Sequence, residues 1–226
     1  MSRYAILLAG GSGTRMGLPD NKVFAPLRGV PAIIRAAIPF TGFCDGMIVV
    51  ARENERDRMR GLLARFGLKH ATIVAGGADR QGSVLQGLRA LPVDCDAVLI
   101  HDGARALVTE AVVERVLQSI EAFGSGVAAL PVTDTVKRAK DGVVVETLDR
   151  SELYAMQTPQ GFRTADILQA HAVAERDGFR GTDDASLLEH AGMSVHLCAG
   201  DSENRKLTTP FDLELAEAIL AAREER

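Results

Sequence analysis

The residues with the clearest chemical character form a glycine-rich loop near the N-terminus. After a short apolar run the chain reads Leu8-Ala9-Gly10-Gly11-Ser12-Gly13-Thr14-Arg15-Met16-Gly17. Glycines let a backbone approach a phosphate closely and direct its N–H groups toward it. Arg15 inside the loop and Lys22 just beyond it would add two cations beside that phosphate. The loop therefore predicts a phosphate site; a tight turn with solvated charges is the alternative.

The common glycine signatures do not fit this loop. Gly11 and Gly13 are followed by Gly17 rather than by a glycine at position 16, which departs from the dinucleotide-binding fingerprint. No Gly-Lys-Ser/Thr ends the loop, so the Walker pattern is absent as well. The five histidines have no His-Glu-x-x-His spacing, and the sequence contains no Gly-x-Ser-x-Gly elbow. These absences disfavour dinucleotide-dependent oxidoreductases, zinc peptidases and serine hydrolases.

A second polar group follows a later apolar run. His101-Asp102 ends a predicted strand, which would place Asp102 at the rim of a sheet. Its carboxylate there could bind a ribose or polyol hydroxyl, or help to hold Mg²⁺ among phosphate oxygens. Arg105 could donate two N–H groups to a substrate phosphate. The alternative is an Asp–Arg pair that closes the loop.

The elements that must position these residues alternate between strand and helix patterns. Apolar runs predict buried strands over 4–9, 46–51, 71–75, 97–101 and 127–132. Helical spacing predicts helices over 52–66, 81–91, 109–120, 164–176, 183–191 and 210–226. This alternation predicts an α/β fold: a Rossmann-like, mostly parallel sheet with helices on both faces. Ligands bind such sheets at the carboxyl ends of the strands, so the loops starting at Gly10, Gly76 and Asp102 should meet.

The alternation breaks after Pro131. Two β-prone segments, 135–138 and 143–147, flank an Asp141-Gly142 turn. We expect an inserted β-hairpin arm over about 133–157, within a single domain spanning 1–226. An isolated hairpin is marginally stable in water, so the arm should pack on another surface such as a second subunit.

Composition limits the possible partners. The formal net charge of −4 gives no general attraction for nucleic acid or anionic lipid, so neither is expected as a partner. No apolar stretch is long enough to span a bilayer, and no signal peptide is evident, which favours a cytoplasmic protein. The three cysteines, Cys44, Cys95 and Cys198, have no metal-ligand spacing and are expected to be reduced thiols.

Taken together, the motifs resemble those of the 2-C-methyl-D-erythritol 4-phosphate cytidylyltransferase family, within the nucleotide-diphospho-sugar transferase-like fold. The resemblance runs nearly end to end. Beyond the glycine loop and Lys22, it rests on Gly76-Gly77 with Arg80 and Ser83, His101-Asp102-Gly103-Ala104-Arg105, Asp134-Thr135-Val136-Lys137, Asp149-Arg150, Gln157-Thr158-Pro159-Gln160 followed by Phe162, Thr182-Asp183-Asp184-Ala185-Ser186, and Asn204-Arg205-Lys206 with Thr208. One such motif is weak, but the ordered set is specific.

The resemblance implies transfer of CMP from CTP to 2-C-methyl-D-erythritol 4-phosphate in the non-mevalonate isoprenoid pathway, with release of pyrophosphate. The implied catalytic residues are Arg15, Lys22 and Lys206. The implied CTP-binding residues are Ala9, Gly10, Gly11, Ser12, Gly13, Thr14, Gly77, Ser83 and Asp102. The implied substrate-binding residues are Asp102, Arg105, Thr135, Arg150, Thr158 and Lys206.

The resemblance also implies Mg²⁺, held mainly by the CTP phosphates, with Asp102 as a candidate additional ligand. It implies a homodimer whose arm carries Thr135 and Arg150 into the partner's site. Ser83 and the backbone around Gly76 to Gly82 are similar to an edge that reads cytosine, although Ser83 could equally cap a helix.

Two other functions stay open from the sequence. One is a cytidylyltransferase for another alditol phosphate, such as ribitol 5-phosphate; Asp134-Thr135 and the 182–186 motif favour methylerythritol. The other is a non-catalytic nucleotide-binding relative, which the retained charged residues argue against. The chain departs from the family pattern at Asn21 and Val23 beside Lys22, at Ala106 after Arg105, and at Ala78, where an acidic residue is usual.

Overall fold

A seven-stranded sheet forms the centre of the computed structural model, which describes residues 1–11 and 20–225. The strand order is β11-β7-β10-β6-β1-β4-β5. The bounds are β1 Arg3–Leu8, β4 Gly46–Ala51, β5 Thr72–Ala75, β6 Ala97–Asp102, β7 Ser125–Pro131, β10 Tyr154–Arg163 and β11 Leu197–Ala199. β10 pairs antiparallel with both β6 and β7, and the other pairings in this sheet are parallel. The predicted mostly parallel sheet is confirmed.

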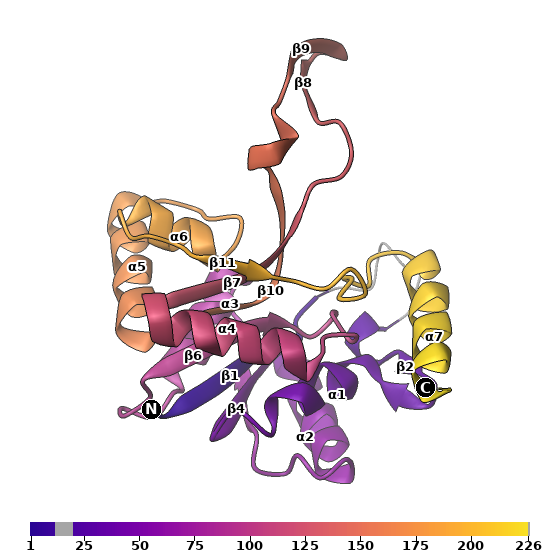
Figure 1. Cartoon of the computed structure of the whole chain (residues 1–226). Helices are drawn as coiled ribbons and strands as arrows, with labels where there is room; N and C mark the ends of the chain where they lie inside the picture. Colours follow the sequence, from indigo (N-terminus) through magenta and orange to yellow (C-terminus); the bar gives the residue numbers. More distant parts are fainter. Residues whose placement is uncertain (12–19, 226) are drawn as a thin grey trace.

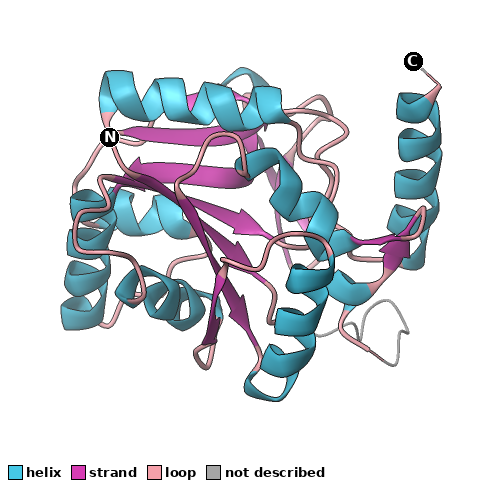
Figure 2. Cartoon of the chain, turned by 90° about the horizontal axis from the view of Figure 1, so that it is seen from below, coloured by secondary structure: helices cyan, strands magenta, loops and turns pink. Residues whose placement is uncertain are grey.

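Helices cover both faces of the sheet (Figure 2). The bounds are α1 Ala32–Ala37, α2 Arg56–Arg65, α3 Arg80–Arg89, α4 Glu110–Phe123, α5 Thr164–Asp177, α6 Asp184–His190 and α7 Pro210–Glu224. Successive β1 side chains point to opposite faces: Leu7 packs in the apolar cluster with α1, α2 and α4, and Ile6 packs in the cluster with α3, α5 and α6. Burial on both faces explains why the strands read as continuous apolar runs.

The C-terminal helix α7 lies to one side of the sheet (Figure 1). A capping box between Thr209 and Asp212 starts it, with Pro210 in its first turn. Leu220 packs with Leu27 and Leu207 in a third apolar cluster. Leu27 belongs to the small antiparallel pair β2 (Pro26–Leu27) and β3 (Val30–Pro31). This cluster fixes the loop that carries Lys206.

The predicted arm stands away from the body (Figure 1). Its strands are β8 (Lys137–Lys140) and β9 (Val143–Thr147), so β8 begins two residues later than the sequence indicated. Asp141 and Gly142 have φ of 51° and 79°, as the central residues of a type I′ hairpin turn require. The arm leaves from the end of β7 and returns into β10.

Four short 3-10 helices complete the described structure. They are η2 (Lys22–Phe24), η3 (Ile38–Phe40), η4 (Glu53–Glu55) and η5 (Arg150–Glu152). Among the described helices, none combines the length and apolar character needed to cross a membrane.

Candidate active site

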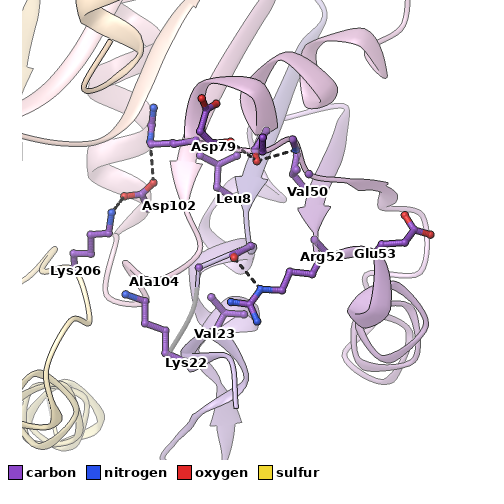
Figure 3. A pocket seen from close by; sticks show the side chains of 18 residues that line it. Leu8, Lys22, Val23, Val50, Arg52, Glu53, Asp79, Asp102, Ala104 and Lys206 are labelled. Carbon is purple, nitrogen blue, oxygen red and sulfur yellow. Dashed lines mark hydrogen bonds and ion pairs between the residues drawn. The ribbon is translucent and has the colours of Figure 1, made fainter. Parts of the chain in front are cut away.

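A cavity of about 600 Å³ opens at the carboxyl ends of β1, β4, β5 and β6 (Figure 3). The loops after Leu8, Ala51, Ala75 and Asp102 contribute most of its walls, as the fold class predicts. The described lining residues are Leu8, Gly10, Gly11, Lys22, Val23, Val50, Ala51, Arg52, Glu53, Gly76, Gly77, Ala78, Asp79, Arg80, Ser83, Asp102, Ala104 and Lys206.

Asp102 is the carboxylate at the end of β6 and has a cation on each oxygen. Lys206 Nζ lies 2.6 Å from Oδ2, and Arg80 Nε lies 3.6 Å from Oδ1. Figure 3 shows the Lys206 and Asp102 side chains pointing toward one another. Burial alone would raise the pKa of Asp102, but Lys206 and Arg80 outweigh that effect and hold the pKa at about 2. Asp102 is therefore ionised at neutral pH.

Arg80 is a site residue for which the sequence indicated no role. Its NH2 group lies 2.7 Å from Oδ2 of Asp184, which is fully buried at the start of α6. Burial opposes the charge of Arg80, but Asp184 and Asp102 outweigh it and raise the pKa of the guanidinium. Its place in the Gly76-Gly77 motif was a signal, but the partner lies 104 residues later and follows only from the fold.

Lys22 lines the cavity from a buried position, with 6% of its surface exposed. Its Cε atom is 3.7 Å from where a Cβ on Gly11 would lie, so its side chain runs beside the glycine loop. Asn21 secures this turn: its amide donates to the Ala9 carbonyl at 2.6 Å and to Glu55 Oε2 at 2.9 Å. Asn21 thus fixes Lys22 through side-chain hydrogen bonds, at a position where the chain departs from the family pattern.

The loop after β5 is closed by Ser83. Its hydroxyl accepts from the Gly77 N–H at 3.1 Å and donates to the Asp79 carbonyl at 2.8 Å. The residue that caps α3 is Asp79, which accepts from the Gly82 N–H, so Ser83 is not the N-cap. A Cβ on Gly77 would lie 2.5 Å from the Gly82 carbonyl carbon, so glycine at 77 is required by this close approach. Ala78 lines the cavity, and Asp79 pairs with Arg180 at 2.8 Å.

Thr158 and Arg105 lie behind Asp102. The Asp102 N–H donates to Thr158 Oγ1 at 3.0 Å, and Thr158 Oγ1 lies 2.9 Å from His101 Nδ1. The second ring nitrogen, Nε2, is 3.2 Å from the Arg105 carbonyl, an acceptor, so Nε2 carries the proton and Thr158 donates to Nδ1. Arg105 donates to the carbonyls of Asn204 at 2.7 Å and Met156 at 3.3 Å. Both side chains hold the Asp102 loop in place.

The remaining predicted residues fall into two groups. Thr135 and Arg150 lie exposed on the arm, where Arg150 donates to the Thr133 carbonyl at 2.7 Å. None of residues 132–153 lines this cavity. Ser12, Gly13, Thr14 and Arg15 lie outside the described residues. Within 1–11 and 20–225, no group of three or more His, Cys, Asp or Glu side chains is arranged to hold a metal ion.

The cavity can bind a polyphosphate. Lys22 and Lys206 bring positive charge to a pocket whose first loop is Gly10-Gly11, at the ligand-binding edge of an α/β sheet. Charge neutralisation and positioning are the means by which phosphoryl and nucleotidyl transfer is catalysed. This fold and this site define the chain as an α/β nucleotidyltransferase.

Comparison with known proteins gives the family. The family model described as IspD, 2-C-methyl-D-erythritol 4-phosphate cytidylyltransferase, matches residues 4–222. The protein of that name from Bacillus velezensis is 44% identical over 98% of this chain and 97% of its own length. The one from Halalkalibacterium halodurans is also 44% identical, over the full length of both chains. The crystal structure of the Thermus thermophilus protein of that name superposes with a TM-score of 0.82 at 32% identity, covering 98% of this chain and 100% of that one. The crystal structure of 4-diphosphocytidyl-2C-methyl-D-erythritol synthase from Anaerococcus prevotii superposes with a TM-score of 0.87 at 27% identity. The match covers 97% of this chain and 98% of that one. The chain belongs to this family and is a cytidylyltransferase.

Proposed function

We propose that this enzyme transfers CMP from CTP to 2-C-methyl-D-erythritol 4-phosphate, with release of pyrophosphate, and that the cavity at the strand ends is the active site. The observation that carries the proposal is the placement of Lys206 and Asp102 on one wall and Lys22 with Gly11 on another wall of one cavity. One cationic wall suits the nucleotide phosphates, and the Asp102–Lys206 pair suits a ligand with both hydroxyl and phosphate groups. The family match supports the same substrates.

The reaction is an in-line displacement at the α-phosphorus of CTP. A phosphate oxygen of the alditol phosphate attacks, the bond to the β-phosphate breaks, and pyrophosphate takes the electron pair. The attacking oxygen is ionised at neutral pH, so no general base is required. Catalysis then depends on holding two mutually repelling anions in line and on neutralising the charge that develops on the α-phosphate. Lys22, which is shielded from water beside Gly11, and Arg15 supply that charge.

The nucleotide occupies the part of the cavity between the glycine loop and the loop after β5. Ala9, Gly10, Gly11, Ser12, Gly13 and Thr14 bind its phosphates, and Gly77 with Ser83 forms the edge that meets cytosine. Ser83 contributes by fixing the Gly77 backbone, because its hydroxyl already bonds Gly77 and Asp79. The alditol phosphate lies beside Asp102 and Lys206, and Thr158 and Arg105 support this wall.

Mg²⁺ is the proposed cofactor, held mainly by phosphate oxygens of CTP. Asp102 fits a supporting role, because its carboxylate lines the cavity, is ionised, and offers the hard oxygen atoms that Mg²⁺ prefers. When bound, the ion supplies positive charge to the phosphates. The chain's own contribution is to hold Asp102 and Lys22 in fixed positions around them.

The proposed assembly is a homodimer of single-domain subunits whose active sites are shared. Thr135 and Arg150 lie on an arm that contributes no residue to the cavity of its own subunit. Val143, Val144 and Val145 are exposed along β9 and offer an apolar surface for a partner. An arm that crosses to a second copy would bury these residues and bring Thr135 and Arg150 to the partner's alditol phosphate.

A pyrophosphate-release assay tests the proposed reaction. The purified enzyme with Mg²⁺ is offered CTP, UTP, ATP or GTP, each with methylerythritol phosphate or ribitol 5-phosphate. We expect turnover with CTP and methylerythritol phosphate to exceed that of every other pair. Faster turnover with ribitol 5-phosphate, or with another nucleotide, would contradict the proposal.

A further inference from the structure

No residue of the 182–186 motif lines the cavity that is proposed to hold the substrates. Asp184 is the first residue of α6 and has no exposed surface. Its Oδ2 lies 2.7 Å from the Arg80 guanidinium, and its Oδ1 has no hydrogen-bond partner among the described residues. A buried carboxylate in this state depends on its one cationic neighbour for compensation. Asp184 is therefore the residue of this motif that connects it to Arg80.

The position of Asp184 is set by the sheet. Gln160 on β10 accepts from the N–H groups of Asp184 and Ala185 at 3.0 and 3.1 Å. Its amide nitrogen donates to Oδ2 of Asp183, the N-cap of α6, at 2.8 Å. Gln160 is itself almost fully buried. Hydrogen bonds with Gln160 thus hold the start of α6 in place, and Asp184 presents its carboxylate to Arg80 from this position.

Arg80 connects Asp184 to the cavity. The planar guanidinium contacts Asp184 through NH2 and faces Asp102 Oδ1 through Nε, at 3.6 Å. Arg80 is therefore hydrogen-bonded to one carboxylate and ion-paired with a second on a different element. On the other side of Asp102, Lys206 is more exposed and belongs to a loop. Of the two cations beside Asp102, Arg80 is the anchored one.

We propose that Arg80, anchored by Asp184, is a positioning residue that holds the Asp102 carboxylate in place for the alditol phosphate while Lys206 binds that ligand's phosphate. When Lys206 turns to the phosphate, Asp102 loses its closest partner, and Arg80 keeps the carboxylate in the same orientation. Asp184 acts on the substrate through Arg80 and Asp102. This inference rests on the proposed role of Asp102 and Lys206 in binding the alditol phosphate.

The test is a mutant cycle read by binding. Removing Arg80 alone would leave Asp184 charged and uncompensated, so the variant is Arg80→Met with Asp184→Asn, which neutralises both. Calorimetry measures the affinity for methylerythritol phosphate in the presence of a non-hydrolysable CTP analogue, and separately the affinity for that analogue. The same changes are then made in an Asp102→Asn background. Arg180→Met is the matched control, because Arg180 forms an exposed 2.8 Å ion pair with Asp79 beside Arg80.

We expect the Arg80/Asp184 variant to bind methylerythritol phosphate about tenfold more weakly, with unchanged affinity for the nucleotide analogue. In the Asp102→Asn background the same changes should cause no further loss, because Arg80 acts through Asp102. Arg180→Met should behave as wild type.

Three results would overturn the inference: wild-type affinity in the variant, an equal further loss in the Asp102→Asn background, or a parallel loss of nucleotide affinity. If the double variant does not fold, Asp184→Asn alone decides by the same comparison. Failure of the wild-type enzyme to bind methylerythritol phosphate would instead contradict the proposed function.

Discussion

Lys206 Nζ lies 2.6 Å from Oδ2 of Asp102, so the cation proposed to bind the alditol phosphate is paired with a protein carboxylate. The loop that carries Lys206 is held against the Asp102 loop, because the Leu207 N–H donates to the Ala104 carbonyl at 2.8 Å. Before the ligand arrives, Asp102 holds the Lys206 ammonium in place. When the ligand binds, its phosphate replaces Asp102 as the anionic partner of Lys206. Such preorganisation lowers the reorganisation required during reaction.

Replacement of Lys206 should act mainly on the alditol phosphate. We expect Lys206→Met to lower kcat/KM for methylerythritol phosphate by about a hundred- to thousandfold, the range for losing one preorganised charged donor. Nucleotide affinity should change little. Steady-state kinetics with each substrate varied in turn measures both effects. Arg205→Met is the control, because the Arg205 guanidinium lies 3.9 Å from Asp212, away from the cavity lining. An equal loss in that control would assign the effect to the loop as a whole.

Lys22 should act on the chemical step. The Lys22 side chain is buried, so Lys22→Met is preferable to Lys22→Ala because it keeps the volume. We expect kcat to fall by about a hundred- to thousandfold. The same fall is expected for Arg15→Ala. If KM rises while kcat stays near wild type, the residue is a binding group and does not stabilise the transition state.

Much of the fold could be predicted because its central strands are buried on both faces. The runs behind β1, β4, β5, β6 and β7 contain almost only apolar residues, and the observed bounds lie within two residues of those predicted. The strand-end rule then places the loops at Gly10, Gly76 and Asp102 around one cavity, as found. The type I′ turn was predictable because Asp-Gly tolerates positive φ at both positions.

The elements that were missed lack a local signal. β10 carries Gln157, Thr158 and Pro159 in its centre, and its pairing with β7 shifts register between Met156 and Gln160, so no regular alternation identifies it. The 3-residue β11 is too short for any pattern. The contact of Arg80 with Asp184 is likewise invisible in the sequence, because the two residues are 104 positions apart and only the fold brings them together.

Buried His101 should make stability depend on pH. Burial lowers its pKa to about 4, so the folded state excludes a proton that the unfolded chain accepts below about pH 6.5. Its contribution is therefore fully present above pH 6.5 and lost as the pH falls to 4, a change of about 3 kcal/mol. The free energy of unfolding, measured in urea at several pH values, rises with pH near pH 5. In His101→Gln this rise should be smaller than in the wild type by about 1.4 kcal/mol per pH unit.

His171 allows a second reading of the same effect, since burial also lowers its pKa to about 4. In the His101→Gln/His171→Gln variant the free energy of unfolding should depend on pH still less than in His101→Gln. The slope is the quantity compared, because either substitution also changes the absolute stability. An unchanged slope in both variants would show that these histidines are protonated in the folded enzyme.

Complementation between two inactive variants should reveal whether the active site is shared. The arm carries Thr135 and Arg150 but contributes nothing to the cavity of its own subunit, and its valines are exposed. One variant carries Lys22→Met in the body, and the other carries Arg150→Ala on the arm. In a heterodimer with crossing arms, one site has both lesions and the other has neither. Random pairing at equal expression should therefore restore about a quarter of wild-type activity.

Differently tagged subunits and tandem purification establish that heterodimers form. If purified heterodimers are as inactive as the parent variants, the arm serves its own subunit and the shared site is wrong.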